Sequence, residues 1–149
     1  MFHDPGVFPF IRSFSENWNV ISDEYLRLNA PILDLHRIGD AEQFVSRLFR
    51  NNGWTPSWQV DSTEPNHNWL TYGLGYKGAF PDDSWEKLPF TTGLLSKLRG
   101  FKVCAFSLMR PRSFLAPHTH PELGNGMLTF HLGLQVVPKK SFLVVDGEP

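Results

Sequence analysis

The sequence predicts an α+β protein, in which helices come first and antiparallel strands follow. The first observation is the helical spacing of apolar residues over 18–28. The second is a change of character after Pro56, where aromatic and β-branched residues are interrupted by turn glycines. The third is an alternation over 126–137 that places apolar residues on one face and mostly polar ones on the other, which is typical of a strand with two different faces.

Composition limits the possible classes of function. The 149 residues form one domain, 1–149, that is long enough to bury a core, and 41% of them are hydrophobic, which excludes a disordered chain. A net charge of −1 gives no electrostatic basis for binding nucleic acid or an anionic membrane. The single Cys104 excludes an internal disulfide, and no signal peptide or apolar run of about 20 residues is found. We therefore expect a cytoplasmic protein without a transmembrane segment.

Two helices are expected in the first half of the chain. The first has Ser13 or Ser15 as its N-cap and ends before Pro31. The second runs from Asp40 as N-cap to Phe49, and Asn51-Asn52-Gly53 ends it. A third, shorter helix follows later in the chain.

The second half predicts that short helix and most of the strands. Thr91 or Thr92 is its expected N-cap, Leu94, Leu95 and Leu98 form its apolar side, and Gly100 closes it. A strand is expected over 69–72, before the glycines at 73, 75 and 78, and three more over 101–109, 126–137 and 141–146.

The end of the sequence predicts an unfinished hairpin. Asp146-Gly147 is one of the strongest signals for a two-residue hairpin turn, and the return strand should begin at Glu148-Pro149. We therefore expect the domain to be incomplete at its C-terminus; the alternative is a naturally short chain with a terminal tail here. Unpaired strand edges would then make a homodimer possible.

The alternating segment 126–137 has one apolar and one polar face. The apolar face holds Leu128, Phe130, Leu132, Leu134 and Val136. The polar face holds Met127, Thr129, His131, Gly133 and Gln135. A polar face of this kind is typical either of the ligand-holding mouth of a small barrel or of an ordinary solvent-facing side, and the pattern does not decide between them.

Three histidines, His118, His120 and His131, fall within fourteen residues. If 117–122 is extended, His118, His120 and Glu122 project to the same side. Imidazole and carboxylate groups suit Fe(II), Mn(II) or Zn(II), and two histidines with one carboxylate are typical of non-haem iron oxygenases. The alternative is that these are surface histidines in a loop.

Ten short motifs follow one another along the chain: Phe8-Pro9-Phe10, Asn17-Trp18, Glu24-Tyr25, Trp69-Leu70, Tyr72-Gly73, Thr91-Thr92-Gly93-Leu94-Leu95, Phe106-Ser107, Pro117-His118, His131-Leu132-Gly133-Leu134 and Val137-Pro138. In this order they resemble motifs of the aspartyl/asparaginyl β-hydroxylase family, whose members are Fe(II)- and 2-oxoglutarate-dependent dioxygenases. The resemblance implies an antiparallel double-stranded β-helix, the cupin-like jelly roll, with N-terminal helices packed on it. It also implies an enzyme that couples decarboxylation of 2-oxoglutarate to hydroxylation of an unactivated C–H bond.

The resemblance assigns roles to individual residues. His118 matches the family's first iron-binding histidine, which makes it the catalytic metal ligand, and Ser107 and His131 match residues that bind the cosubstrate 2-oxoglutarate. His120 stands at a position where the family varies, and it is a third imidazole ligand, a group that orients the ligand, or a bystander. Thr129 stands where the family often has an arginine, so a bidentate carboxylate partner is missing there.

The resemblance also predicts what the chain lacks. The family's second iron-binding histidine and its basic anchor for the distal carboxylate of 2-oxoglutarate lie beyond residue 149, so we expect weak iron binding and slow or no turnover. Family members act on an Asp or Asn residue of a peptide, on a free amino acid or on a lipid acyl chain, and the sequence does not choose among them. Two alternatives are a non-catalytic cupin-like binding module and a zinc cupin hydrolase or isomerase that uses His118, His120, Glu122 and His131.

Overall fold

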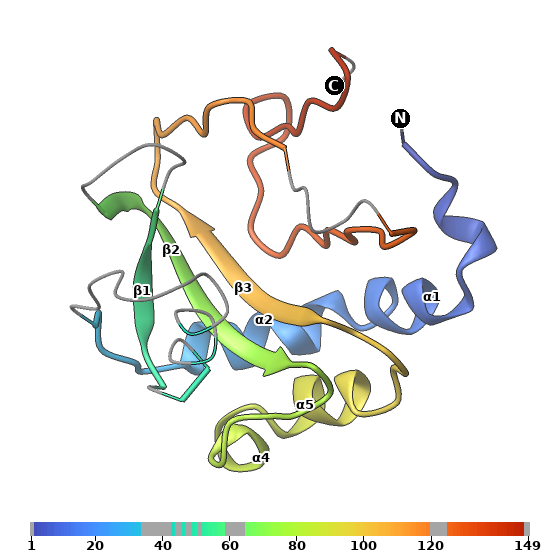
Figure 1. The fold of residues 1–149 in the computed structure, drawn as a ribbon, viewed down its shortest axis with the longest axis vertical. Helices are drawn as coiled ribbons and strands as arrows, with labels where there is room; N and C mark the ends of the chain where they lie inside the picture. Colours follow the sequence, from blue (N-terminus) through green and yellow to red (C-terminus); the bar gives the residue numbers. More distant parts are fainter. Residues whose placement is uncertain are drawn as a thin grey trace.

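A computed structural model of the chain describes residues 2–33, 43, 46, 49–50, 52–58, 65–119 and 125–147. Its elements, in chain order, are the 3-10 helix η1 (Pro5–Val7), helices α1 (Pro9–Ser15) and α2 (Trp18–Arg27), strands β1 (Trp54–Trp58) and β2 (Pro65–Tyr76), helices α4 (Ser84–Lys87) and α5 (Pro89–Leu95), and strand β3 (Val103–Met109). Figure 1 shows α2 crossing behind the strands, with α4 and α5 at one end of the sheet. The prediction of an α+β fold is confirmed.

The three strands form one antiparallel sheet in the order β1-β2-β3, with β2 in the centre. The strand expected over 101–109 is confirmed as β3, and the one expected over 69–72 is part of the longer β2. Thr71 lies opposite Ser107, and Trp69 lies opposite Met109. An irregularity between Gly73 and Gly75 interrupts this register, because Leu74 has no partner on β3.

One face of the sheet forms the hydrophobic core. Its buried side chains are Trp54 of β1, Leu70, Tyr72 and Leu74 of β2, and Phe106 of β3. Helix α2 covers this face through Tyr25, whose ring lies edge-on to Trp54 at 6.0 Å and to Phe106 at 5.5 Å. Full burial of a side chain of this size stabilises the fold by about 1.5–3 kcal/mol, so the packing on this face contributes substantially to stability.

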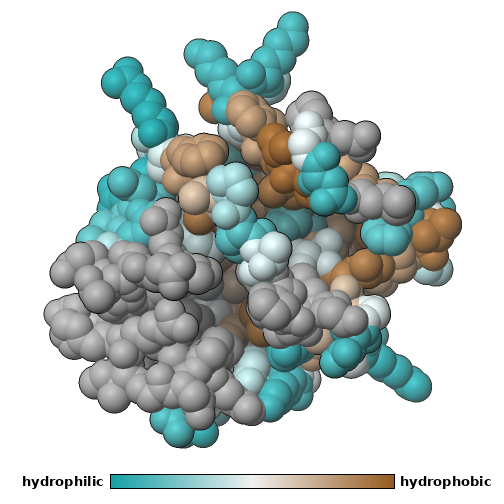
Figure 2. All heavy atoms as spheres, turned by 45° about the horizontal axis from the view of Figure 1, so that its top comes forward, coloured by the Kyte–Doolittle hydropathy of each residue, from teal (hydrophilic) through white to brown (hydrophobic). Residues whose placement is uncertain are grey.

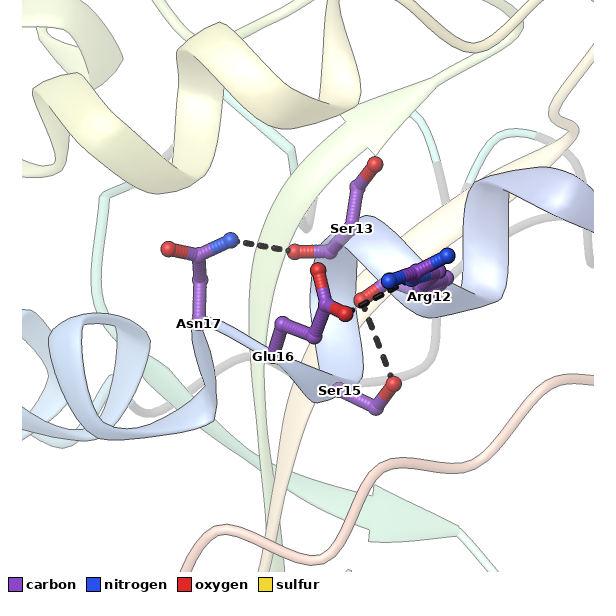
Figure 3. Close-up of polar contacts among 5 residues, drawn as sticks. All are labelled: Arg12, Ser13, Ser15, Glu16 and Asn17. Carbon is purple, nitrogen blue, oxygen red and sulfur yellow. Dashed lines mark hydrogen bonds and ion pairs between the residues drawn. The ribbon is translucent and has the colours of Figure 1, made fainter.

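The first predicted helix is in fact two helices, α1 and α2, and Ser13 and Ser15 are not N-caps. Both serines lie in the last turn of α1, which begins earlier because Pro9 occupies its first position and needs no hydrogen-bond acceptor there. Figure 3 shows the junction, where Asn17 Nδ2 donates to the carbonyl oxygen of Ser13 at 2.8 Å. Arg12 Nε donates to Glu16 Oε1 at 2.6 Å in the same turn. The asparagine side chain thus satisfies a carbonyl that the end of α1 leaves unpaired.

The second predicted helix lies largely outside the described residues, which include neither Asp40 nor Phe44, Val45, Leu48 and Asn51. Gln43 and Ser46 are helical, and Phe49 is in a turn and stacks on Tyr76 with ring centroids 5.6 Å apart. Asn52 has a φ of 47°, the left-handed conformation that is typical of the residue after a helix end.

The prediction that Thr91 or Thr92 caps the short helix is wrong. Helix α5 begins at Pro89, and its N-cap residue Leu88 has no side chain that could cap it. Instead, the buried carboxylate of Glu24 in α2 accepts from Phe90 N at 2.7 Å, from Thr91 N at 2.8 Å and from Thr91 Oγ1 at 2.6 Å. A residue 67 positions earlier therefore caps α5.

The strands predicted over 126–137 and 141–146 are also wrong, because the described residues after Met109 form no strand. A strand requires a neighbour that supplies its backbone hydrogen bonds, and alternating side chains do not provide one. The apolar face of 126–137 is still used in part, since Leu132 and Leu134 pack against the core. Asp146 and Gly147 have φ values of 53° and 82°, the two positive values of a type I′ turn.

Phe130 fixes the middle of this segment to helix α1. Its ring lies edge-on to Phe10 at 5.9 Å and to Phe14 at 6.1 Å. Figure 1 shows the chain turning beyond the end of β3, and the segment from residue 125 onwards lying on the same side of β3 as α1. None of the described helices is long and apolar enough to cross a bilayer.

Candidate functional site

The sheet face opposite the core carries several small and polar side chains beside larger apolar ones such as Trp69 and Met109. Thr71 and Ser107 lie on it as cross-strand partners, and Ser57 Oγ is 2.9 Å from Thr71 Oγ1. Thr55 pairs with Thr71 as well, is fully buried, and its Oγ1 has no hydrogen-bond partner in the described part of the chain. Hydroxyl groups from all three strands thus line this face, which we call the polar face.

Ser107 is exposed on the polar face, and its hydroxyl oxygen accepts a hydrogen bond from Trp69 Nε1 at 2.8 Å. Trp69 lies opposite Met109, so Ser107 is its diagonal neighbour across the strand pair, a distance that a long aromatic side chain can bridge. The indole N–H can only donate, so Ser107 accepts this bond with a lone pair. The serine keeps its own hydrogen for donation to a second partner.

His118 lies in the segment that follows β3, and its ring is 6.3 Å from the ring of Trp69 at an interplanar angle of 42°. Its Nδ1 is 2.9 Å from the carbonyl oxygen of Ala116. Because a carbonyl can only accept, Nδ1 carries the hydrogen, and in the neutral imidazole the lone pair is on Nε2. Metal-binding histidines commonly have this arrangement, in which the other ring nitrogen donates to a carbonyl or carboxylate.

The structure therefore brings two predicted site residues, Ser107 and His118, to the same tryptophan. Trp69 was not predicted as a site residue, because a tryptophan in a strand is more often a packing residue. Its alternation with Thr71 along β2 was visible in the sequence, but the register that places it beside Ser107 was not.

Three predicted site residues remain, namely His120, Glu122 and His131. His131 is exposed, and it lies between Phe130, which packs on α1, and Leu132, which packs on the core. His120 and Glu122 lie outside the described residues. In the part of the chain that the structure describes, no three His, Cys, Asp or Glu side chains group closely enough to hold a metal ion.

Cys104 is on the core face of β3, away from the polar face. Burial raises the pKa of its thiol to about 11. The thiol is therefore neutral near pH 7, where a nucleophilic cysteine would need to be a thiolate. It acts as a packing residue.

The fold and this face define a small α+β protein whose sheet has hydroxyl groups on the face opposite its core and whose segment after β3 places a histidine beside Trp69. The family model described as Aspartyl/Asparaginyl beta-hydroxylase matches residues 15–149, and the chain belongs to this family. The resemblance seen in the sequence is confirmed, and the match supports a hydroxylase type of function. No curated protein and no solved structure gives a significant match.

Proposed function

We propose that this protein is an Fe(II)- and 2-oxoglutarate-dependent dioxygenase that hydroxylates an unactivated C–H bond. The observation that carries the proposal is that Ser107 and His118 both contact Trp69 on the polar face, in a chain of the β-hydroxylase family. The proposed substrate is an Asp or Asn residue of a peptide, an amino acid or a lipid acyl chain. The proposed fold is a double-stranded β-helix, in which β1, β2 and β3 would belong to one sheet.

His118 is the proposed catalytic iron ligand. Its Nδ1 donates to Ala116, so the neutral ring directs the lone pair of Nε2 away from that contact, as a metal ligand requires. His120 is proposed as a second imidazole ligand, because it is two residues further on and would project to the same side of an extended segment. Iron with bound 2-oxoglutarate supplies the oxidising chemistry that protein side chains lack.

Ser107 and His131 are proposed to bind 2-oxoglutarate. The Ser107 hydroxyl accepts from Trp69, so its hydrogen can be donated to a carboxylate of the cosubstrate. An imidazole N–H of His131 can donate to the same dianion. Thr129 offers a hydroxyl where many relatives have an arginine, so carboxylate binding here depends more on neutral donors.

An anaerobic titration of the protein with Fe(II) and 2-oxoglutarate tests this proposal. The proposal expects a weak visible charge-transfer band that appears at high iron concentration and is absent from His118→Ala. The matched control is His67→Ala, because His67 is an exposed histidine of β2 without a companion at ligand spacing. Absence of the band from the wild-type protein, or a band of equal intensity in His118→Ala, would count decisively against His118 as the iron ligand.

Zinc and iron can be separated in the same preparation. Metal analysis of protein purified without added metal distinguishes the proposed oxygenase from a zinc hydrolase or isomerase, since the two differ in the metal retained. Bound zinc with no response to 2-oxoglutarate would favour the hydrolase or isomerase.

A further inference from the structure

Trp69 makes two separate contacts with the residues proposed to bind the cosubstrate and the metal. Its indole N–H donates to Ser107 Oγ at 2.8 Å, and its ring lies 6.3 Å from that of His118. These contacts come from three parts of the chain, namely β2, β3 and the segment after β3. Trp69 is thus the side chain that connects the two proposed functions of the site.

We propose that Trp69 is a positioning residue that orients Ser107 for the cosubstrate and restricts the imidazole of His118. This inference rests on the proposed function, because it assigns Trp69 a part in the same site. Neither contact requires Trp69 to touch iron, 2-oxoglutarate or the reacting C–H bond. It acts through its two neighbours.

The hydrogen bond to Ser107 sets the direction of the serine hydroxyl. A serine O–H rotates among staggered positions and has one hydrogen and two lone pairs. The indole N–H occupies one lone pair, which leaves fewer directions for the hydrogen. Because Ser107 is exposed, water would otherwise compete for the same lone pair, so the indole favours the orientation in which the serine donates outward.

The ring contact restricts an otherwise exposed histidine. His118 is also held by the hydrogen bond from its Nδ1 to Ala116 O, so its ring is limited from two directions. Ordering a side chain before its ligand arrives lowers the entropic cost of binding. Trp69 therefore favours metal binding at His118 by pre-organisation.

Packing of the core does not explain this tryptophan. Trp54 is the contrasting case, since it is 8% exposed and contacts Tyr25 and Tyr72 in the core. Trp69 is only partly buried and is not among the described side chains that pack against the core cluster. A substitution that preserves an aromatic ring at position 69 should therefore leave the fold intact.

The test compares Trp69→Phe with the matched control Trp18→Phe, which removes an exposed indole from α2. Phenylalanine keeps a ring beside His118 but has no N–H. Calorimetric titration with Mn(II) in place of iron measures binding without turnover. We expect Trp69→Phe to weaken 2-oxoglutarate binding by roughly tenfold, with Mn(II) affinity unchanged, and Trp18→Phe to change neither.

A double mutant separates positioning of Ser107 from a general effect. If Trp69 acts through the serine, Trp69→Phe combined with Ser107→Ala should bind 2-oxoglutarate no more weakly than Ser107→Ala alone. Losses that multiply in the double mutant, or unaltered 2-oxoglutarate affinity in a folded Trp69→Phe, would overturn the proposal. Far-ultraviolet circular dichroism of each variant verifies the fold.

A spectroscopic measurement distinguishes failure of this inference from failure of the proposed function. Co(II) quenches indole emission at short range, so Co(II) at His118 should quench the fluorescence of the wild type and of Trp18→Phe, but much less that of Trp69→Phe. Quenching without any effect of Trp69→Phe on 2-oxoglutarate binding rejects the positioning role and leaves the metal site standing. Absence of both quenching and cosubstrate binding in the wild type rejects the proposed function, and this inference with it.

Discussion

The most informative test of the fold is the replacement of Glu24 by glutamine. Glu24 is 6% exposed, and its carboxylate accepts three hydrogen bonds from the first turn of α5, two from backbone N–H groups and one from the Thr91 hydroxyl. Glutamine keeps nearly the same shape but has one acceptor oxygen and no charge, and its NH₂ group would face donors. The expected result is a large loss of stability without a large loss of volume.

The size of the effect follows from the contacts. A hydrogen bond to a charged group contributes about 1.5–3 kcal/mol, and a neutral one about 0.5–1.5 kcal/mol. Converting three such bonds from charged to neutral, together with losing the favourable charge at a helix N-terminus, gives a loss of about 3–5 kcal/mol. That is a substantial fraction of the roughly 5–15 kcal/mol by which domains are stable.

Urea denaturation monitored by tryptophan fluorescence measures this loss. The control is Asp23→Asn, which removes an exposed carboxylate from the same helix and should change the free energy of unfolding by less than about 0.5 kcal/mol. Thr91→Val completes a double-mutant cycle, in which we expect a coupling energy of about 1–2 kcal/mol with Glu24. A coupling near zero, or equal effects of Glu24→Gln and Asp23→Asn, would show that the carboxylate does not hold α5.

Two further predictions concern β3 and the segment after it. Burial raises the pKa of the Cys104 thiol from 9.0 to about 11. The thiol therefore ionises at a lower pH in the unfolded chain than in the native protein, and the free energy of unfolding falls as the pH rises from 9.0 towards 11. Cys104→Ala should reduce this loss of stability, which urea denaturation at several pH values measures. An unchanged dependence on pH would contradict this account. Phe130 is 38% exposed and packs on two rings of α1. Phe130→Ala should therefore lower the free energy of unfolding by about 1 kcal/mol. It should also increase the rate of amide hydrogen exchange more over 125–134 than in β2. Uniform exchange would mean that this contact does not anchor the segment.

The sequence predicted which side chains meet the core better than it predicted backbone conformation. Leu132 and Leu134 were placed correctly on an apolar face, and both pack on the core, although their segment forms no strand. Alternation reports which side chains are buried, whereas a strand also needs a hydrogen-bonding neighbour, and no local pattern specifies one. The helix starts were misplaced for a related reason, because Pro9 and Pro89 begin helices that a rule based on serine and threonine caps assigned to later residues.

The candidate site was predictable only where a motif marked it. Ser107 and His118 were identified from the family resemblance, and strand parity placed Ser107 on one face with Ala105 and Met109. Trp69 was missed because its importance depends on register with a residue 38 positions later. Glu24 was missed as a cap for the same reason, since its partners are 66 and 67 positions later in the sequence.

The division of the sheet into a core face and a polar face has a consequence for how such a protein can change over time. Phe106 is buried in the core, while its neighbour Ser107 is exposed. Adjacent positions on β3 are thus under independent constraints, one set by folding and the other, under the proposed function, set by the ligand. New specificities can then arise by exchanging every second residue, with little penalty to the scaffold that presents them.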